Sequence, residues 1–289
     1  MNRSDENKVT NKNTRSKRKN RLHRTNARNR ASSFILLGII VFGGFILFAL
    51  PQFYISDIQI SGQRIVTYEQ LIEKSNIKKG SHLFDGIGGS ISEIFSLRHV
   101  AAEKILIENL PYIKSIKIRS VFPSTLSMTL EERVEVAYIS INDGYLIIDA
   151  NGIALEIQSK EQSIGIPVIE GITVNRFVLG AKAQVDEHEN LNQTVILLNA
   201  IINAQKDSRS DYQIIPSILS IRPVGGNIIF MKLKMSDKND NLTINVKVSV
   251  SSEEDMLWLR FALKQGKLQG LGSGVLDLTT TQRVFIPDN

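Results

Sequence analysis

Few residues in this chain have the types and spacing that catalysis or metal binding needs. The four histidines are His23, His82, His99 and His188, and no two have the spacing of metal ligands on one helix, such as i and i+4. The chain has no cysteine, which excludes a disulfide scaffold, a thiolate zinc site, an iron–sulfur centre and a cysteine nucleophile. The sequence therefore predicts no metal site and no cofactor, and each histidine is interpreted as a surface or structural residue.

Two groups of neighbouring acids have the residue types of a general acid–base pair in a hydrolase. Glu131 and Glu132 end a predicted strand, where successive side chains point to opposite faces, and Glu253–Asp255 begin a predicted helix, where acids act as caps. Gly86–Gly89 lacks the Lys-Ser/Thr pair of a phosphate-binding loop and is interpreted as a flexible surface turn. No G-x-S-x-G turn and no S-x-x-K with a partner motif occurs. The sequence predicts no catalytic residue and a protein that is not an enzyme.

The first thirty residues and the rest of the chain differ sharply in net charge. Of the 289 residues, the first thirty hold eleven Lys and Arg against two acids, a local net charge of +9. The remaining 259 residues hold 24 basic and 27 acidic side chains, a net charge of −3, so we expect no nucleic-acid partner for this body. Residues 1–32 contain too few apolar side chains to bury a core, and they predict a disordered basic cytoplasmic tail.

Residues 33–51 predict a single transmembrane helix. Phe34–Leu50 is a run of seventeen residues with no charged or polar side chain, close to the length that crosses a hydrocarbon core of about 30 Å. The run exceeds the usual apolar region of a signal peptide and has no clean small-x-small cleavage site. Because the basic block precedes it, the positive-inside rule predicts a cytoplasmic N-terminus and an extracytoplasmic C-terminus. A nucleic-acid-binding arm is the alternative interpretation of the basic block.

Residues 53–131 predict a compact α+β unit with the order β-α-α-β-β. Thr67 and Gln70 have the spacing of a capping box, which predicts the start of the first helix. Pro111 stops the second helix, and apolar residues alternate with polar ones from Leu126 onward, as in a half-buried antiparallel strand. The predicted elements are a strand at 54–60, helices at 67–75 and 100–109, and strands at 113–121 and 126–132.

Residues 132–289 predict a mainly antiparallel β domain with two helices. Asn-Asp-Gly and Asn-Gly turns separate its first three strands, and apolar stripes at helical spacing mark both helices. No low-complexity linker precedes this region, so we expect a tight junction with the first unit. The predicted strands are at 136–141, 145–149, 153–157, 218–221, 228–235, 242–250, 275–278 and 283–286, and the predicted helices are at 187–207 and 253–265.

Motifs around this junction resemble those of a known family. The most specific is the run VFPSTLSMTLEERVEVAYI at residues 121–139. Weaker similarities occur at IQISG (58–62), GSHLF (80–84), LPYI (110–113), IPVIEG (166–171) and GVLDLTTTQRVFI (274–286). On these motifs the chain resembles the FtsQ/DivIB family of bacterial cell division proteins. The signature residues that carry the resemblance are Gly62, Pro111, Pro123, Leu126, Glu132 and Arg133.

Two departures from the family pattern concern loop geometry. Glu135 stands where the family usually has proline, and Asp85–Arg98 is an additional segment before the second helix.

At the junction itself, Arg133 leaves one predicted unit and enters the next. Its fork of donors suits an ion pair between the two units or a cap on backbone carbonyls.

The resemblance implies a fold and a role. The fold is a POTRA domain followed by the family's β domain, and the role is a non-catalytic scaffold at the division septum that recruits and coordinates the septal cell-wall synthesis complex. The implied partners are FtsB/DivIC-like and FtsL-like division proteins and, through them, an FtsW-type glycosyltransferase and a septal penicillin-binding protein. The alternatives to this scaffold role are a POTRA-bearing envelope assembly or secretion factor and a membrane-anchored cell-wall hydrolase.

The resemblance also implies that a partner adds a strand to the last strand of the β domain. The last two predicted strands contain no proline and only Arg283 as an edge charge, so this edge is poorly defended. We expect Phe285 to be a buried anchor, and proline at Val284 to remove a ladder donor and abolish partner capture. The alternative is that the second helix covers these strands. The candidate partner-binding residues are Val275, Leu276, Asp277, Leu278, Arg283, Val284, Phe285 and Ile286.

Overall fold

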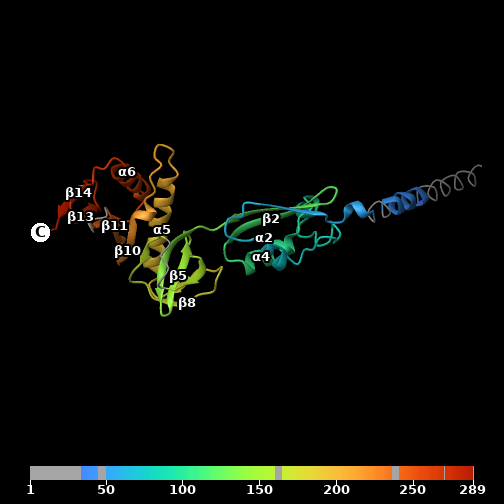
Figure 1. The fold of residues 1–289 in the computed structure, drawn as a ribbon, viewed down its shortest axis with the longest axis horizontal. Helices are drawn as coiled ribbons and strands as arrows, with labels where there is room; N and C mark the ends of the chain where they lie inside the picture. Colours follow the sequence, from blue (N-terminus) through green and yellow to red (C-terminus); the bar gives the residue numbers. More distant parts are fainter. Residues whose placement is uncertain (1–33, 45–49, 160–164, 236–240, 270, 289) are drawn as a thin grey trace, which may run out of the picture.

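The computed structural model describes residues 34–44, 50–159, 165–235, 241–269 and 271–288 (Figure 1). The predictions for the tail, 1–32, and for part of 33–51 lie outside these residues. Residues 34–44 form a helix whose large apolar side chains are exposed. Among the described residues, no helix is both long enough and apolar enough to cross a membrane.

A three-stranded sheet with the order β1-β3-β2 follows the short 3-10 helix Pro51–Phe53. The central strand β3 is parallel to β1 and antiparallel to β2, and α4 packs against β2 while α2 packs against α4. Leu71, Leu106 and Leu126 are fully buried between the helices and the sheet. The elements of this part are β1 (Asp57–Ser61), α2 (Tyr68–Ser75), α3 (Ile91–Phe95), α4 (Val100–Asn109), β2 (Ile113–Val121) and β3 (Thr125–Glu132).

The predicted start of α2 is confirmed. The Thr67 hydroxyl accepts a hydrogen bond from the Gln70 amide at 3.3 Å, and the Gln70 side chain accepts one from the Thr67 amide at 3.0 Å. Each of two backbone donors that the helix leaves unpaired thus receives a side-chain acceptor.

The predicted order β-α-α-β-β was incomplete, because the additional segment Asp85–Arg98 contains the short helix α3. The turn predicted at Gly86–Gly89 is present at the surface, and two of its glycines have positive φ. Gly86 and Gly89 have φ of +83° and +114°, and a Cβ at Gly89 would lie 2.5 Å from the Glu93 carboxylate. The loop therefore has a defined path against α3, which a residue with a side chain at position 89 would obstruct.

The remainder of the chain builds a nine-stranded sheet with the order β14-β13-β12-β11-β10-β7-β4-β5-β6. Most neighbours are antiparallel, as predicted, but β4–β7, β7–β10 and β12–β13 are parallel. The strands are β4 (Glu135–Ile141), β5 (Gly144–Asp149), β6 (Ala154–Gln158), β7 (Val168–Ile169), β10 (Ile218–Gly225), β11 (Ile228–Lys234), β12 (Asn241–Lys247), β13 (Gly274–Leu278) and β14 (Val284–Pro287).

Helices α5 (His188–Gln205) and α6 (Ser252–Lys264) pack against each other and bury the inner face of this sheet. Arg260 on α6 is fully buried, and its guanidinium donates to the carbonyls of Tyr212 and Ala204, both at 2.7 Å, of Asp207 at 2.8 Å, and of Ser210. One arginine thereby ties α6 to the end of α5 and the loop after it. The smaller elements are the hairpin β8 (Val174–Arg176) and β9 (Gln184–Val185), and the 3-10 helix Ile215–Ser217.

Candidate functional site

Glu132, at the end of β3, anchors a loop and does not form half of a catalytic pair. Its carboxylate accepts three consecutive backbone amides, Arg64 N at 2.9 Å, Ile65 N at 2.7 Å and Val66 N at 2.9 Å. Three amides that converge on one anion fix the path of the chain from β1 into α2. Glu131 forms a separate, exposed ion pair. The two acids therefore do not share a reaction site.

Gly62 is the second signature residue at this point. Its φ is +89°, and a Cβ built on it would lie 1.9 Å from the carbonyl oxygen of Leu130. Glycine is required here for its backbone conformation and for the close approach to β3. The approach brings the loop after β1 within reach of Glu132, so these two signature residues support one structural feature.

Arg133 joins the two sheets. Its backbone amide donates to the Tyr112 carbonyl at 2.7 Å, and its Nη1 donates to Asp149 Oδ2 at 2.8 Å. Asp149 is buried and also accepts the backbone amides of Asn151 and Ile153 at 2.8 and 2.9 Å. The ion pair predicted for Arg133 is thus present, and it connects the end of β3 to the turn that follows β5.

Further contacts cross the same junction. The hydroxyl of Tyr112 lies 2.6 Å from Glu135 Oε1 and 2.9 Å from Glu156 Oε2, and its single proton can be donated to one of them at a time. Burial and then these two hydrogen bonds raise the pKa of Tyr112 well above its ordinary value. Glu135, where the resembled family has proline, therefore makes a contact that proline could not. The residues of the second sheet that join the apolar core of the first are Tyr138, Ile147 and Leu155.

The other signature residues are structural parts of the three-stranded sheet and its helices. Leu126 is fully buried in the core. Pro123 lies in the turn between β2 and β3, after a cis peptide bond to Phe122. Pro111 follows Leu110, whose amide closes α4 by donating to the carbonyl of Leu106.

The terminal hairpin forms one edge of the nine-stranded sheet, and among the described residues no strand pairs with the outer side of β14. The Asp288 amide donates to the Ser273 carbonyl at 3.0 Å, in register with the β13–β14 pairing. Because bonded and non-bonded pairs alternate in antiparallel ladders, the amides of Val284 and Ile286 point toward β13. The amide and carbonyl of Phe285 point to the open side. The Val284 amide is therefore a ladder donor toward β13, and the effect of proline at this position on partner capture stays a prediction.

The side chains of this hairpin divide between two faces. Leu276 and Leu278 are buried in the main core, and the Phe285 ring packs against that core and over Gly274. The Phe285 ring is half-buried and already packs on the protein's own core, and its role as a partner anchor stays a prediction. The hairpin side chains on the opposite face are Val275, Asp277, Val284 and Ile286, of which Val284 and Ile286 are 46% and 55% exposed.

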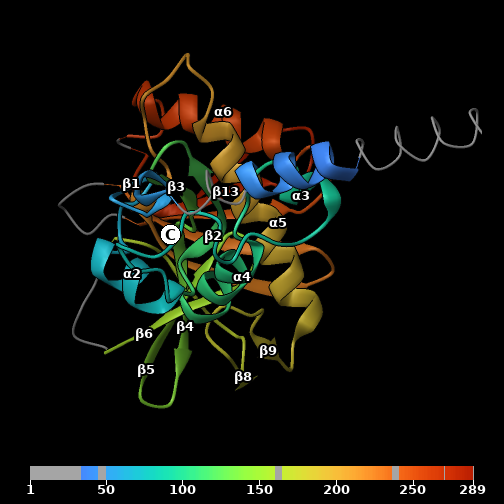
Figure 2. The ribbon, with the colours of Figure 1, turned by 90° about the vertical axis from the view of Figure 1, so that its right-hand side faces the viewer.

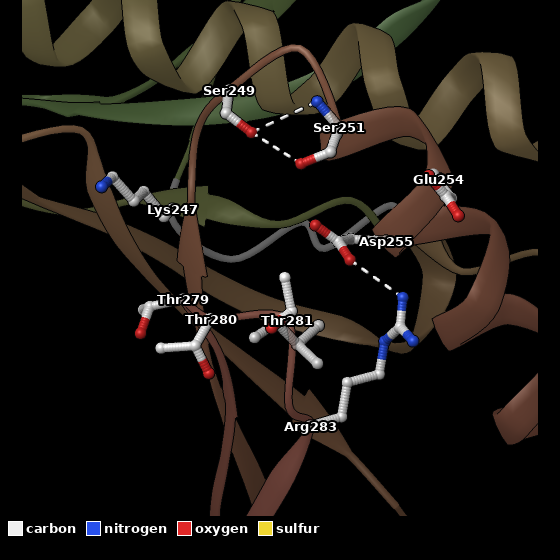
Figure 3. Close-up of a pocket in the computed structure, with 10 residues that line it drawn as sticks. Lys247, Ser249, Ser251, Glu254, Asp255, Thr279, Thr280, Thr281 and Arg283 are labelled. Carbon is white, nitrogen blue, oxygen red and sulfur yellow. Dashed lines mark hydrogen bonds and ion pairs between the residues drawn. The ribbon is translucent and has the colours of Figure 1, made fainter.

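Arg283, predicted as an edge charge, instead folds back onto α6. Its guanidinium lies 3.1 Å from Asp255 Oδ1 and 4.7 Å from the centre of the Trp258 ring. These contacts border a hollow of about 430 Å³ between the start of α6, Lys247 and the β13–β14 turn (Figure 3). The hollow is lined by hydroxyls, acids and basic groups that can form hydrogen bonds. It lies beside the open edge of β14. Helix α6 thus covers the inner face of the hairpin and leaves the edge itself uncovered.

The histidines within the described residues have structural positions. His99 is buried at the start of α4, with Nε2 2.8 Å from the Ser120 hydroxyl, and burial lowers its pKa. The His82 ring packs edge-on against Tyr54, with ring centres 5.2 Å apart. Across the described part of the chain, no three His, Cys, Asp or Glu residues gather as they would around a metal ion.

Comparisons with known proteins agree with this geometry. Residues 53–133 match the family model of the POTRA domain, FtsQ-type. The cell division protein DivIB of Clostridium acetobutylicum is 31% identical over 146 residues, which cover 50% of this chain and 54% of that protein. DivIB of Clostridium botulinum strain Hall is 22% identical over 254 residues, which cover 87% of this chain and 89% of the relative. The chain is thus similar to proteins named DivIB and FtsQ, and its residues 53–133 match the FtsQ-type POTRA domain.

FtsQ from Syntrophotalea carbinolica is another similar protein, 26% identical over 157 residues that cover 54% of this chain. The chain spans about half the length of this relative and of the Clostridium acetobutylicum DivIB, 51% and 54%. These relatives are named cell division proteins. The match to residues 53–133 confirms the predicted POTRA domain.

Proposed function

We propose that this chain is a member of the FtsQ/DivIB family and a non-catalytic scaffold of cell division that binds the septal cell-wall synthesis complex outside the cytoplasm. In this proposal residues 33–51 form a single membrane span, the N-terminus is cytoplasmic, 53–131 is the POTRA domain and 132–289 the β domain. The protein sits in the cell membrane at the division septum. The relatives that support a division role are named cell division proteins DivIB and FtsQ.

The proposed partners are an FtsB/DivIC-like and an FtsL-like division protein and, through them, an FtsW-type glycosyltransferase and a septal penicillin-binding protein. The open edge of β14 is the observation that carries the proposal. It offers the unpaired amide and carbonyl of Phe285, flanked by the exposed side chains of Val284 and Ile286. An added strand would bond to the main chain there and pack its own side chains on the two apolar ones.

The exposed face of the sheet beside this edge is rich in positive charge. Across neighbouring strands, Arg222, Lys232, Lys234 and Lys247 are exposed on the face away from the helices, with Asp277 as the acid among them. Charge complementarity favours a partner segment with acidic side chains on the face that meets this sheet, which would speed its association. We therefore propose an acidic, strand-forming segment of the FtsB/DivIC-like protein as the direct ligand of β14.

The experiment measures binding of the purified FtsB/DivIC-like protein to the full chain in lipid nanodiscs. We expect Ile286→Lys to weaken binding at least about tenfold, because a lysine at an exposed edge opposes strand addition and removes an apolar contact. The matched control is Val224→Lys on β10, which is 46% exposed in the same sheet but away from the edge. Equal affinity of the Ile286→Lys and wild-type chains would refute binding at β14.

A further inference from the structure

Helix α3 has the opposite arrangement of side chains from an ordinary surface helix. Ile91, Ile94 and Phe95 lie on one face at i, i+3 and i+4 spacing, and they are 75%, 47% and 85% exposed. Surface helices usually turn such residues inward and their charges outward. Here the charged residue of the helix, Glu93, is held against the protein, so the apolar face is left to the surroundings.

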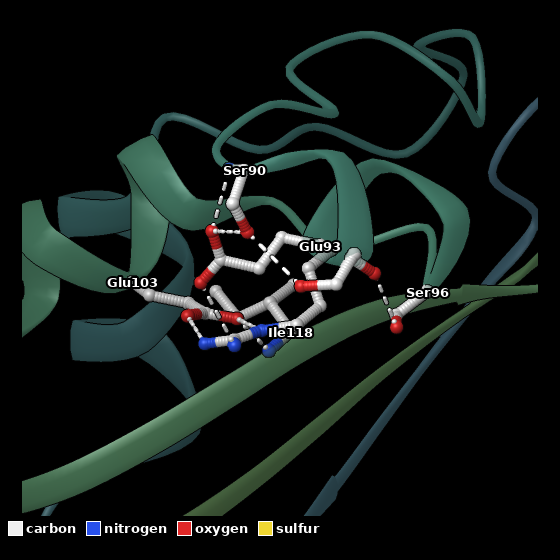
Figure 4. Close-up of polar contacts among 7 residues, drawn as sticks. Ser90, Glu93, Ser96, Glu103 and Ile118 are labelled. Atoms are coloured by element: carbon white, nitrogen blue, oxygen red, sulfur yellow. Dashed lines mark hydrogen bonds and ion pairs between the residues drawn. The ribbon is translucent and has the colours of Figure 1, made fainter.

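Figure 4 shows the contacts that hold α3 in this orientation. Glu93 Oε2 accepts the amide and the hydroxyl of Ser90 at 2.7 and 2.8 Å, and Glu93 Oε1 accepts Arg98 Nη1 at 3.1 Å. Arg98 Nε donates to Glu103 Oε1 at 3.1 Å, and that oxygen also accepts the Ile118 amide at 2.8 Å. This chain of contacts joins α3 to α4 and to β2, so the outward position of the apolar face is structurally determined.

The apolar surface continues from α3 onto the end of β2. The Ser120 amide donates to the Leu97 carbonyl at 3.0 Å, which brings the end of α3 beside that strand. Val121 and Phe122, the next residues, are 46% and 55% exposed. We call this area the α3 surface and define it by five apolar residues, namely Ile91, Ile94, Phe95, Val121 and Phe122.

The α3 surface lies at the end of the three-stranded sheet where the chain enters from the apolar run Phe34–Leu50. Phe53, three residues after that run, packs against both Phe84 and Phe122 with ring centres 5.9 Å apart. The Leu83 amide donates to the Phe53 carbonyl at 2.6 Å. Figure 2 views this end, with α3 visible there. A bilayer holding the apolar run would therefore meet this end of the domain.

The same end carries the residue types that favour a membrane interface. Tyr54 is 42% exposed, and the exposed Lys78 and Lys79 stand beside it because the Gly80 amide donates to the Ile55 carbonyl at 2.8 Å. Aromatic rings are enriched at headgroup level, and lysines there attract anionic lipids. Apolar residues flanked by these groups match the composition of the boundary between headgroups and acyl chains.

We propose that the α3 surface inserts into the outer boundary of the bilayer that anchors the chain, and so fixes the tilt of the first domain over the membrane. The inference rests on the membrane span in the proposed function. It goes beyond that proposal by assigning a lipid contact to the segment Asp85–Arg98, which departs from the family pattern. Binding of a protein to the same surface is the other outcome that the experiment can reveal.

The test uses the full chain in vesicles of phosphatidylethanolamine and phosphatidylglycerol. The chain has no native cysteine, so a single cysteine can carry an environment-sensitive fluorophore without other changes. We expect the Phe95→Cys label to show a blue-shifted emission that falls when lipids with a shallow spin label are added. The Val250→Cys label, at a fully exposed position of the second domain, should show neither effect.

A third label, at Phe42→Cys inside the apolar run, separates this inference from the proposed span. It is measured with lipids that carry a deep spin label, because position 42 lies at the middle of the run. Quenching at position 42 together with a solvent-like, unquenched label at position 95 would overturn the lipid contact and leave the span intact. Absence of quenching at both positions would overturn the span itself. A label at 95 that stays solvent-like in vesicles but becomes shielded when the purified division partner is added would assign the surface to that protein.

Discussion

At the scale of single residues, the family signature consists of structural contacts and not of a reaction site. Glu132 closes a loop by accepting three amides, and Gly62 allows that loop to approach β3. The buried His99 serves the packing of α4. The contacts of Glu132 and His99 can be tested by measuring stability, because Glu131 and His188 supply matched control positions.

Glu132→Gln is expected to lower the free energy of unfolding by about 1–3 kcal/mol. The amide retains one acceptor oxygen for three backbone donors and loses the negative charge that strengthens those hydrogen bonds. Chemical unfolding of the detergent-solubilised chain measures the effect. Glu131→Gln is the control, since it removes only an exposed ion pair with Lys114 and should leave stability nearly unchanged. Equal effects of the two changes would contradict the role given to Glu132.

Because His99 is buried, we expect the free energy of unfolding to fall on mild acidification. Burial lowers its pKa below the ordinary value of 6.5, so the ring is neutral in the folded chain. The unfolded chain takes up the proton first as pH falls. The contribution of His99 is therefore complete above about pH 6.5 and declines below it, until the folded pKa is reached.

Unfolding measured at about pH 7 and at about pH 5.5 checks this dependence. We expect His99→Gln to flatten the change in unfolding free energy between the two conditions, whatever its effect at neutral pH. His188→Gln, at the exposed start of α5, is the control and should keep the wild-type slope. An unaltered slope in His99→Gln would assign the acid sensitivity to other groups.

At the scale of elements, the decisive contacts lie where one element meets another. The ion pair of Arg133 and Asp149 links β3 to β5, and Arg260 links α6 to the loop after α5. The edge of β14 is uncovered because α6 packs only on the inner face of its sheet. Element positions thus decide both the rigidity of the junction and the surface left for a partner.

Arg133→Ala is expected to lower the free energy of unfolding by about 3 kcal/mol and to widen the range of angles between the two sheets. Removal of the arginine leaves the buried Asp149 carboxylate without its countercharge. Thermal unfolding and small-angle scattering measure the two effects. The exposed pair of Arg209 and Asp207 supplies the control, because Arg209→Ala should change neither quantity appreciably. Unchanged melting and unchanged scattering of Arg133→Ala would count against this account of the junction.

At the scale of the whole molecule, the described domains stand in line (Figure 1). The three-stranded sheet is nearest the apolar run, and the open edge of β14 is at the far end. If the run spans the membrane, the proposed partner-binding edge is carried away from the bilayer by the full length of both sheets. The α3 surface and the β14 edge would then act at opposite ends of one molecule.

The basic block before the apolar run predicts which end of the chain lies in the cytoplasm. A reporter that is active only in the cytoplasm should work when fused before Arg30 and fail when fused after Asn289, because the basic block is retained on the cytoplasmic side. Reporter activity in living cells, with expression levels checked on blots, measures this. Activity from the C-terminal fusion alone would reverse the orientation and remove the proposed function.

The amino-acid sequence by itself determined the features that depend on neighbours a few residues apart. The capping box of Thr67 and Gln70, the helix that ends before Pro111 and the alternation of β3 follow from local periodicity and hydrogen bonding, and the structure has each of them. The sequence signature of the FtsQ-type POTRA domain could be recognised for the same reason. Short elements such as β7 were missed, because two residues carry no period.

Only the tertiary structure decided what depends on residues distant in the chain. The amides that Glu132 binds are 66–68 residues away, and no local pattern indicates that they meet. The direction of the Val284 amide follows from strand register, and the inward position of the Phe285 ring follows from packing over Gly274. Residues 91–95 include the apolar Ile91, Ile94 and Phe95, but the ion pairs of Glu93 and Arg98 turn that face outward. Such contacts form only when the whole chain has folded, so their geometry lies beyond any window of sequence.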